Sequence, residues 1–152
     1  MTTGWIIAFG LATLLVAGLS LYLGRLLRLL QQQKQQQQAD VQKKNAYLFE
    51  SIDLIARAMQ EGQCELSEGA LRIWVLLDHL QLGQKPEART QYPALFQMYE
   101  VVKDMPTHQA RKERDKKEIR HLDHIRQQAE INLKDAILAD VGTLLDWLKK
   151  AA

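Results

Sequence analysis

The residues of this chain best suited to chemistry are His121 and His124, with Glu118 one helical turn before His121. Histidines three positions apart lie on one face of a helix, so this pair could share a metal ion. Glu118 and His121 form Glu-x-x-His, a motif that di-metal helical bundles draw from each of two helices. The chain has no second copy of the motif. A metal-binding protein or hydrolase that uses Glu118, His121 and His124 is therefore the alternative hypothesis, and a homodimer would have to supply the other half.

The sequence contains no other catalytic constellation. It has no His-Glu-x-x-His, no glycine-rich phosphate loop and no Gly-x-Ser-x-Gly. The single cysteine, Cys64, has no histidine near it in sequence, and a catalytic thiol needs a base. A single thiol also suits a reducing cytoplasm. We therefore predict that the protein is not an enzyme and that it uses no cofactor and no metal.

The most basic stretch of the chain begins at Arg111, and acidic residues interrupt it throughout. Nucleic-acid binding needs a one-sided basic face, with aromatic side chains for single strands, and residues 108–145 contain no aromatic residue. We therefore expect an exposed helix face that contacts a protein partner or anionic lipid headgroups, and we do not favour nucleic acid. The candidates for partner contact are Arg111, Arg114, Lys116, Lys117 and Arg120, and any solvent-facing aromatic residue between Tyr92 and Tyr99.

The element that would hold these residues at a membrane is the run of residues 4–24, which contains no charged residue. As a helix it would be roughly 30 Å long, about the thickness of the hydrocarbon core of a bilayer. Trp5 and Tyr22 lie near its two ends, where amphipathic rings favour the headgroups. The run therefore predicts a transmembrane helix. Its small residues Gly4, Ala8 and Ala12 share one face, which leaves a homodimer possible.

The flanking charges predict the orientation of this helix. No lysine or arginine precedes the run, and the basic residues that follow are Arg25, Arg28, Lys34, Lys43 and Lys44. Because positive charge stays in the cytoplasm, the N-terminus should be periplasmic and the rest cytoplasmic. The uncharged start and the long apolar core differ from a cleaved signal peptide. We therefore expect a single-pass signal anchor.

The remainder of the chain predicts an all-α fold with a small helical bundle and a long C-terminal helix. Residues 25–40 are a glutamine-rich juxtamembrane stalk, either helical or disordered, and residues 41–152 are long enough for one cytoplasmic helical domain. Helix-permissive residues dominate, and no strand-like alternation stands out.

Four helices are expected in this domain. The first carries a short heptad seam, too short for a free coiled coil, in which Asn45 either sets the register of a dimer or lies partly exposed near a helix start. It ends at Gly62. The second starts at a Ser67 cap and, being apolar nearly all round, should be central to the core. The third begins at Pro93. Residues 107–150 form a long helix, or two, with an exposed charged first half and a packed second half. The seam consists of Val41, Asn45, Leu48, Ile52, Ile55 and Met59.

Two segments of the chain carry a resemblance to a known family. They are NAYLFESIDLIARAMQEGQCELSEGALRIWVLLDHL and QYPALFQMYEVVKDMP, which a charged helix follows. The chain resembles a domain-of-unknown-function family of single-span proteins of the bacterial inner membrane, from the apolar run to about Arg126. The resemblance implies an inner-membrane setting and supplies no functional residue. With the rest of the sequence it favours a membrane-anchored interaction or scaffold protein.

Overall fold

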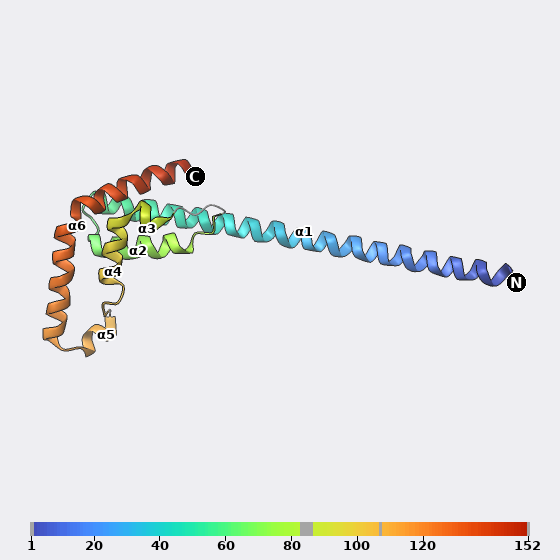
Figure 1. Ribbon diagram of the computed structural model, residues 1–152, viewed down its shortest axis with the longest axis horizontal. Coiled ribbons are helices and arrows are strands. Elements are labelled where there is room, and N and C mark those ends of the chain that lie inside the picture. Colours follow the sequence, from blue (N-terminus) through green and yellow to red (C-terminus); the bar gives the residue numbers. More distant parts are fainter. Residues whose placement is uncertain (1, 83–86, 107, 152) are drawn as a thin grey trace. The chain divides into compact units, whose positions relative to one another are not determined.

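The computed structural model of the protein describes residues 2–82, 87–106 and 108–151. Over these residues the chain is helical and contains no strand, which confirms the all-α prediction. Six helices follow one another in the described residues, and Figure 1 labels them. They are α1 (Thr2–Gln60), α2 (Leu66–His79), α3 (Ala88–Gln91), α4 (Pro93–Val102), α5 (His108–Glu113) and α6 (Lys116–Ala151). The chain divides into two compact units, residues 1–43 and 44–152.

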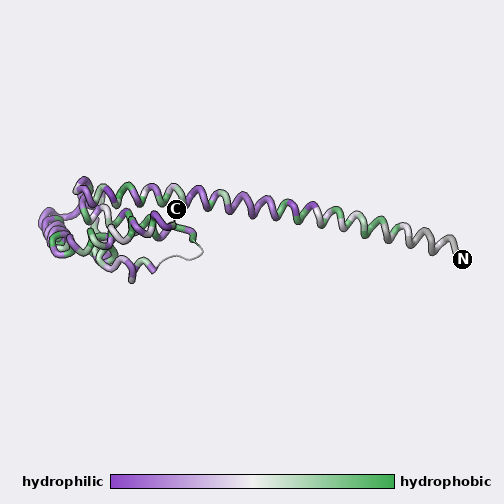
Figure 2. Tube along the Cα trace, turned by 90° about the horizontal axis from the view of Figure 1, so that it is seen from above, coloured by the Kyte–Doolittle hydropathy of each residue, from purple (hydrophilic) through white to green (hydrophobic). Residues whose placement is uncertain are grey.

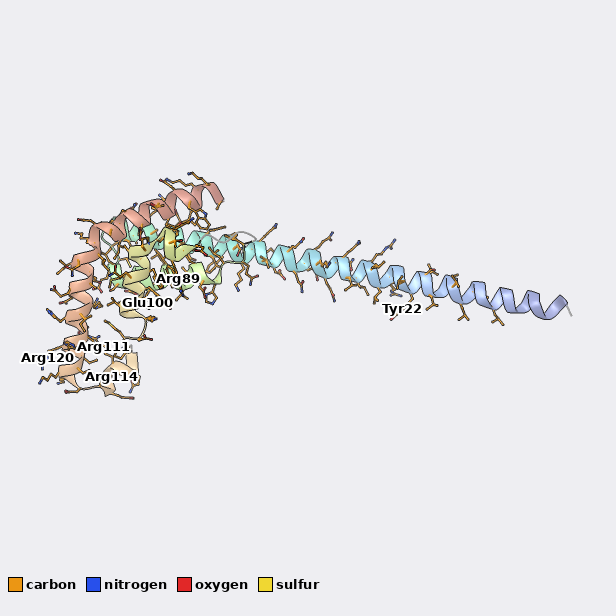
Figure 3. The ribbon with its side chains drawn as sticks, viewed as in Figure 1. Tyr22, Arg89, Glu100, Arg111, Arg114 and Arg120 are labelled. Carbon is orange, nitrogen blue, oxygen red and sulfur yellow. The ribbon has the colours of Figure 1, made fainter. Side chains whose placement is uncertain are left out.

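The first unit is the N-terminal part of α1. From Leu14 onward the helix is long and apolar enough to cross a membrane, and none of its apolar window is buried. Figure 2 shows the hydrophobic colour of this part giving way to hydrophilic colour over the glutamine run. Residues 31–38 are helical, so the glutamine stalk continues α1. Tyr22 is 65% exposed (Figure 3), whereas the side chains of Trp5, Ala8 and Ala12 lie outside the described residues.

The second unit has one hydrophobic core. α4 packs against both α2 and α6, and the end of α1 adds its seam residues to the same core. The most deeply buried large side chains are Ile52, Met59, Ile73, Tyr92, Leu95, Met98, Ile137, Val141 and Leu144. The seam therefore packs inside a helical unit, as expected. α2 is less enclosed than its composition predicts, because Val75 is 43% exposed and Trp74 is only half-buried.

Two glycines, one in the turn between α1 and α2 and one in α2, have backbone positions that suit glycine. Gly62 adopts a φ of 71°, a left-handed conformation that suits glycine, and its N–H donates to Met59 O at 3.2 Å. This confirms the predicted helix end. The Cα of Gly69 lies under the side chain of Met59, so a β-carbon there would lie 2.3 Å from Met59 Sδ. The predicted Ser67 cap is wrong, because Glu65 occupies the N-cap position and Ser67 lies in the first turn of α2.

The C-terminal region consists of two helices, α5 and α6. Residues 109–118 are exposed throughout, as the sequence predicts for the charged half. Thr107, the first residue of the predicted C-terminal helix, lies outside the described residues. The buried apolar residues of α6 begin at Ile137. The apolar side chains before it are less covered, since Ile125 and Ile131 are 39% and 68% exposed. The apolar stripe of α6 is therefore covered over its last four turns and only partly before them.

Candidate functional site

Two carboxylates of α6 close the open N-termini of neighbouring helices. Asp140 Oδ2 accepts the N–H groups of Ala94 at 2.7 Å and Leu95 at 3.0 Å, in the first turn of α4. Glu130 Oε1 accepts the N–H of Ser67 at 3.1 Å, in the first turn of α2. Neither α2 nor α4 receives a hydrogen bond from the side chain of its own N-cap residue. α6 therefore supplies the caps that these two helices lack.

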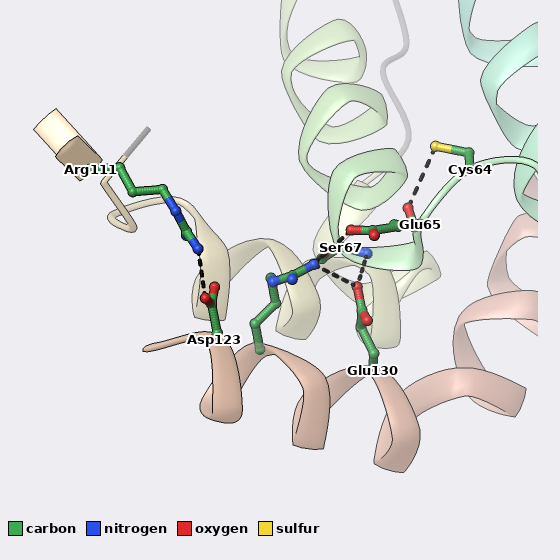
Figure 4. A network of polar contacts seen from close by, with 7 residues as sticks. Cys64, Glu65, Ser67, Arg111, Asp123 and Glu130 are labelled. Carbon is green, nitrogen blue, oxygen red and sulfur yellow. Dashed lines mark hydrogen bonds and ion pairs between the residues drawn. The ribbon is translucent and has the colours of Figure 1, made fainter. Parts of the chain in front are cut away.

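Ion pairs near the Glu130 cap connect the first half of α6 to the start of α2, as Figure 4 shows. Arg126 Nη1 donates to Glu65 Oε2 at 2.7 Å and to Ser67 Oγ at 3.3 Å, and it lies 3.6 Å from Glu130 Oε1. Arg126 therefore links α6 to the residues at the start of α2. Ser67, which the sequence predicted as the N-cap of this helix, is buried and takes part in these contacts.

A second ion pair joins α5 to α6. Arg111 Nη2 donates to Asp123 Oδ2 at 2.6 Å, and this hydrogen bond lowers the pKa of the Asp123 carboxyl. Both residues line a pocket of about 530 Å³ beside α2, together with Arg126 and the pair Glu68–Arg72. Every one of these charges has an opposite partner, so the pocket has little net field.

A different pocket is lined by basic side chains. It has a volume of about 640 Å³ and is lined by Arg111, Lys112, Arg114, Lys116, Ile119 and Arg120, with no carboxylate in the lining. We call it the basic groove. Figure 3 shows Arg111, Arg114 and Arg120 gathered where α5 leads into α6. Arg114 pairs with Glu118 and Arg111 with Asp123, whereas Lys112, Lys116 and Arg120 have no acidic partner among the described residues.

The structure thus brings together four of the five residues predicted for partner contact. Arg111, Arg114, Lys116 and Arg120 line the basic groove, and Lys117 does not. The sequence named these residues but did not show that they share a surface without carboxylates, because acidic residues alternate with the basic ones along the chain. A local signal was present: Asp115 followed three positions later by Glu118 is typical of a helix start. α6 begins at that point, and Ile119 N–H donates to Asp115 O at 3.0 Å.

The residues of the metal hypothesis do not form a centre. Glu118 accepts a hydrogen bond from Arg114, and His121 and His124 are exposed on α6. Over the described part of the chain, no three His, Cys, Asp or Glu side chains gather so that they could hold a metal ion. The arrangement gives the alternative hypothesis no support.

Three aromatic side chains meet between α2 and α4. The ring centroid of Trp74 lies 4.9 Å from that of Phe96 and 5.6 Å from that of Tyr99, and all three rings are half-buried. The guanidinium carbon of Arg89 lies 5.0 Å from the Phe96 centroid. The rings contact one another and so form the edge of the helix packing. Of the aromatic residues predicted as candidates for partner contact, Tyr92 is fully buried, whereas Phe96 and Tyr99 are half-buried and reach the surface.

Cys64 lies in the α1–α2 turn and is half-buried. Its Sγ donates to Glu65 O at 3.5 Å. Burial raises the pKa of the Cys64 thiol, and the negative charge of Glu68 raises it further. Both effects favour the protonated thiol, which is the weaker nucleophile.

The comparisons with known proteins concern nearly the whole chain. A family model described as "Protein of unknown function (DUF2489)" matches residues 16–144. A relative from Haemophilus influenzae (strain ATCC 51907 / DSM 11121 / KW20 / Rd), called "Uncharacterized protein", is 42% identical over 147 residues, which cover 95% of each chain. No solved structure matches. The chain therefore belongs to the DUF2489 family, whose function is unknown.

Proposed function

We propose that the protein is a membrane-anchored interaction protein without catalytic activity. In this proposal the apolar start of α1 spans the bacterial inner membrane once, and the unit of residues 44–152 recruits a partner at the cytoplasmic face. The observation that carries the proposal is the exposure of large apolar side chains in residues 1–43, where Leu14, Leu19 and Leu21 are 73%, 66% and 77% exposed.

Such exposure is unfavourable in water. Burying apolar surface stabilises by roughly 25 cal/mol per Å², and soluble monomers rarely expose large contiguous apolar patches. A bilayer would cover the helix on every side, and α1 satisfies its own backbone hydrogen bonds there. The basic residues that follow the run, among them Arg25 and Arg28, favour a cytoplasmic C-terminal side.

The proposed interaction role follows from the remaining chemistry. Cys64 favours its protonated form, the charges of the pocket beside α2 neutralise one another, and Glu118 is engaged by Arg114. The basic groove of the second unit is lined by five cationic side chains and no carboxylate. A surface of this kind recognises acidic groups, so we assign the partner-contact role to it.

Membrane insertion can be tested with charge substitutions in the full chain. Leu15→Arg with Leu19→Arg places two charges in the proposed span, each opposed by about 2.5–3.5 kcal/mol at its centre. The matched control, Leu54→Arg with Ile131→Arg, changes two residues of similar exposure, 69% and 68%, in the second unit. The wild type and the control should remain in the membrane pellet after an alkaline carbonate wash, and the span variant should not. A wild-type chain that leaves the pellet would refute the anchor.

The orientation needs a separate measurement. A reporter that is active only in the cytoplasm, fused after Ala152, should be active, and one that requires the periplasm should not. The reverse result would place the second unit, with Cys64, in an oxidising compartment and would refute the cytoplasmic assignment.

A further inference from the structure

The basic groove separates charges that the sequence interleaves. The segment that forms it also contains Glu113, Asp115 and Glu118, yet none of these carboxylates lines the groove. Three of its five cations lack an acidic partner among the described residues. Charges of one sign along a concave surface raise the local potential. The five basic side chains of the groove therefore favour an anion there.

Two further features define the anion. The groove includes Lys116 and Ile119 from the first turn of α6, so its lining comes from the start of this helix and from α5. Arginine presents paired N–H donors that match the oxygens of a phosphate, and lysine adds point charge. Ile119 is half-buried and gives the same surface an apolar contact. A phosphate attached to an apolar group fits this combination better than a free inorganic ion.

We propose that the basic groove binds the phosphate of anionic phospholipid headgroups in the bilayer that holds α1. This inference rests on the membrane anchor proposed above. Apart from Arg25 and Arg28, residues 4–30 carry no charge, and as a helix they are about 40 Å long against roughly 30 Å of hydrocarbon. Such an excess is accommodated by tilting, and the arginine side chains extend toward the headgroups.

The length of the connecting segment supports a lipid as the occupant. Residues 31–43 link the apolar run to the second unit and span about 20 Å as a helix. A short tether of this kind raises the effective concentration of the second unit at the surface of the bilayer that holds α1. Each basic residue near an anionic surface strengthens binding about fivefold, so the three unpaired cations together give roughly a hundredfold preference over a neutral bilayer.

The test uses the full chain in nanodiscs of phosphatidylcholine, with or without about 30% phosphatidylglycerol. A fluorophore on Ala110→Cys, in a Cys64→Ala background, reports contact with lipids that carry a quencher on the headgroup. Ala110 is exposed and lies on α5 beside the groove. Quenching should be several-fold stronger in the anionic discs and should fall in high salt, because salt screens exposed charges.

Matched variants separate the groove from net charge. Lys112→Gln, Lys116→Gln and Arg120→Gln together should reduce quenching in anionic discs to the level of neutral discs. The control set, Lys134→Gln, Lys149→Gln and Lys150→Gln, removes the same charge from exposed positions of α6 outside the groove and should keep the response. An equal loss in both sets would overturn the assignment to the groove.

The remaining outcomes distinguish the two proposals. Chains that do not elute with either kind of disc would refute the membrane anchor, and the lipid site would fall with it. Chains that elute with discs but show no response to phosphatidylglycerol would overturn the lipid site alone. Loss of the response in millimolar inorganic phosphate, or on addition of a single-stranded oligonucleotide at unchanged low salt, would show another phosphate source in the groove and would also overturn it.

Discussion

The hydroxyl of Tyr92 offers a quantitative test of the packing between α4 and α6. The side chain is fully buried, and its hydroxyl has no hydrogen-bond partner among the described residues. Burial, and then the negative charge of Asp140, raises the pKa of Tyr92 from its ordinary 10 to about 12. We predict that Tyr92→Phe will leave stability at neutral pH unchanged or raise it by up to about 1 kcal/mol, because it removes a buried polar group without a partner.

The same substitution should remove part of the stability loss at alkaline pH. Because the folded state disfavours the Tyr92 phenolate, Tyr92 leaves stability independent of pH below pH 10, and the free energy of unfolding falls as the pH rises from 10 through 12. At pH 11 the loss is about 1.4 kcal/mol, and above pH 12 it approaches about 2.7 kcal/mol. Between pH 8 and pH 11 the free energy of unfolding of Tyr92→Phe should therefore fall by about 1.4 kcal/mol less than that of the wild type.

Urea unfolding of the full chain in detergent, followed by tryptophan fluorescence, measures these differences. Lysine and arginine titrate equally in the wild type and the variant, so the difference isolates Tyr92. Tyr47→Phe is the control, because that side chain is 68% exposed, and it should behave as the wild type. Equal losses at pH 11 would refute the reasoning. A loss above about 1.5 kcal/mol at neutral pH would mean that the hydroxyl has a partner, such as an ordered water.

Three further substitutions test the contacts between helices. Asp140→Ala should destabilise by about 2 kcal/mol in urea unfolding, because α4 loses its cap, and a change under about 0.5 kcal/mol would contradict that role. Gly69→Ala should lower the thermal midpoint, since the new methyl group meets Met59, and the combination with Met59→Ala should be less damaging than the two changes added. Asn45→Ala should destabilise by about 1–3 kcal/mol and speed amide exchange at Gln81; unaltered exchange would refute the contact.

The parts of the fold that sequence predicts are those with local signals. The end of α1 follows from Gly62, whose left-handed conformation stops a helix, and the start of α4 follows from Pro93, which suits a first turn. The all-α class follows from helix-permissive composition and periodic apolar residues. Each of these inferences depends on residues within a few positions of one another.

The parts that sequence does not predict depend on distant partners. Asn45 Nδ2 donates to Gln81 O at 2.8 Å and Asn45 Oδ1 accepts from Gln81 N–H at 3.0 Å, so a heptad position serves a loop 36 residues away. Asn45 is 8% exposed, which corrects the expectation of a partly exposed residue. Asp140 and Glu130 look like ordinary surface carboxylates in the sequence, yet each caps a helix that lies far from it along the chain.

The basic groove and the hydrophobic core involve different parts of α6, so substitutions in the groove can be interpreted separately from folding. The groove lies on residues that are exposed or half-buried, whereas Ile137, Val141 and Leu144 are fully buried in the core. The capping residue Asp140 also lies in the buried half. Exposed surface substitutions usually change stability by less than about 0.5 kcal/mol, and screened ion pairs add little more. A charge change in the groove should therefore leave the core and the caps intact, so a loss of binding in such a variant reports recognition rather than unfolding.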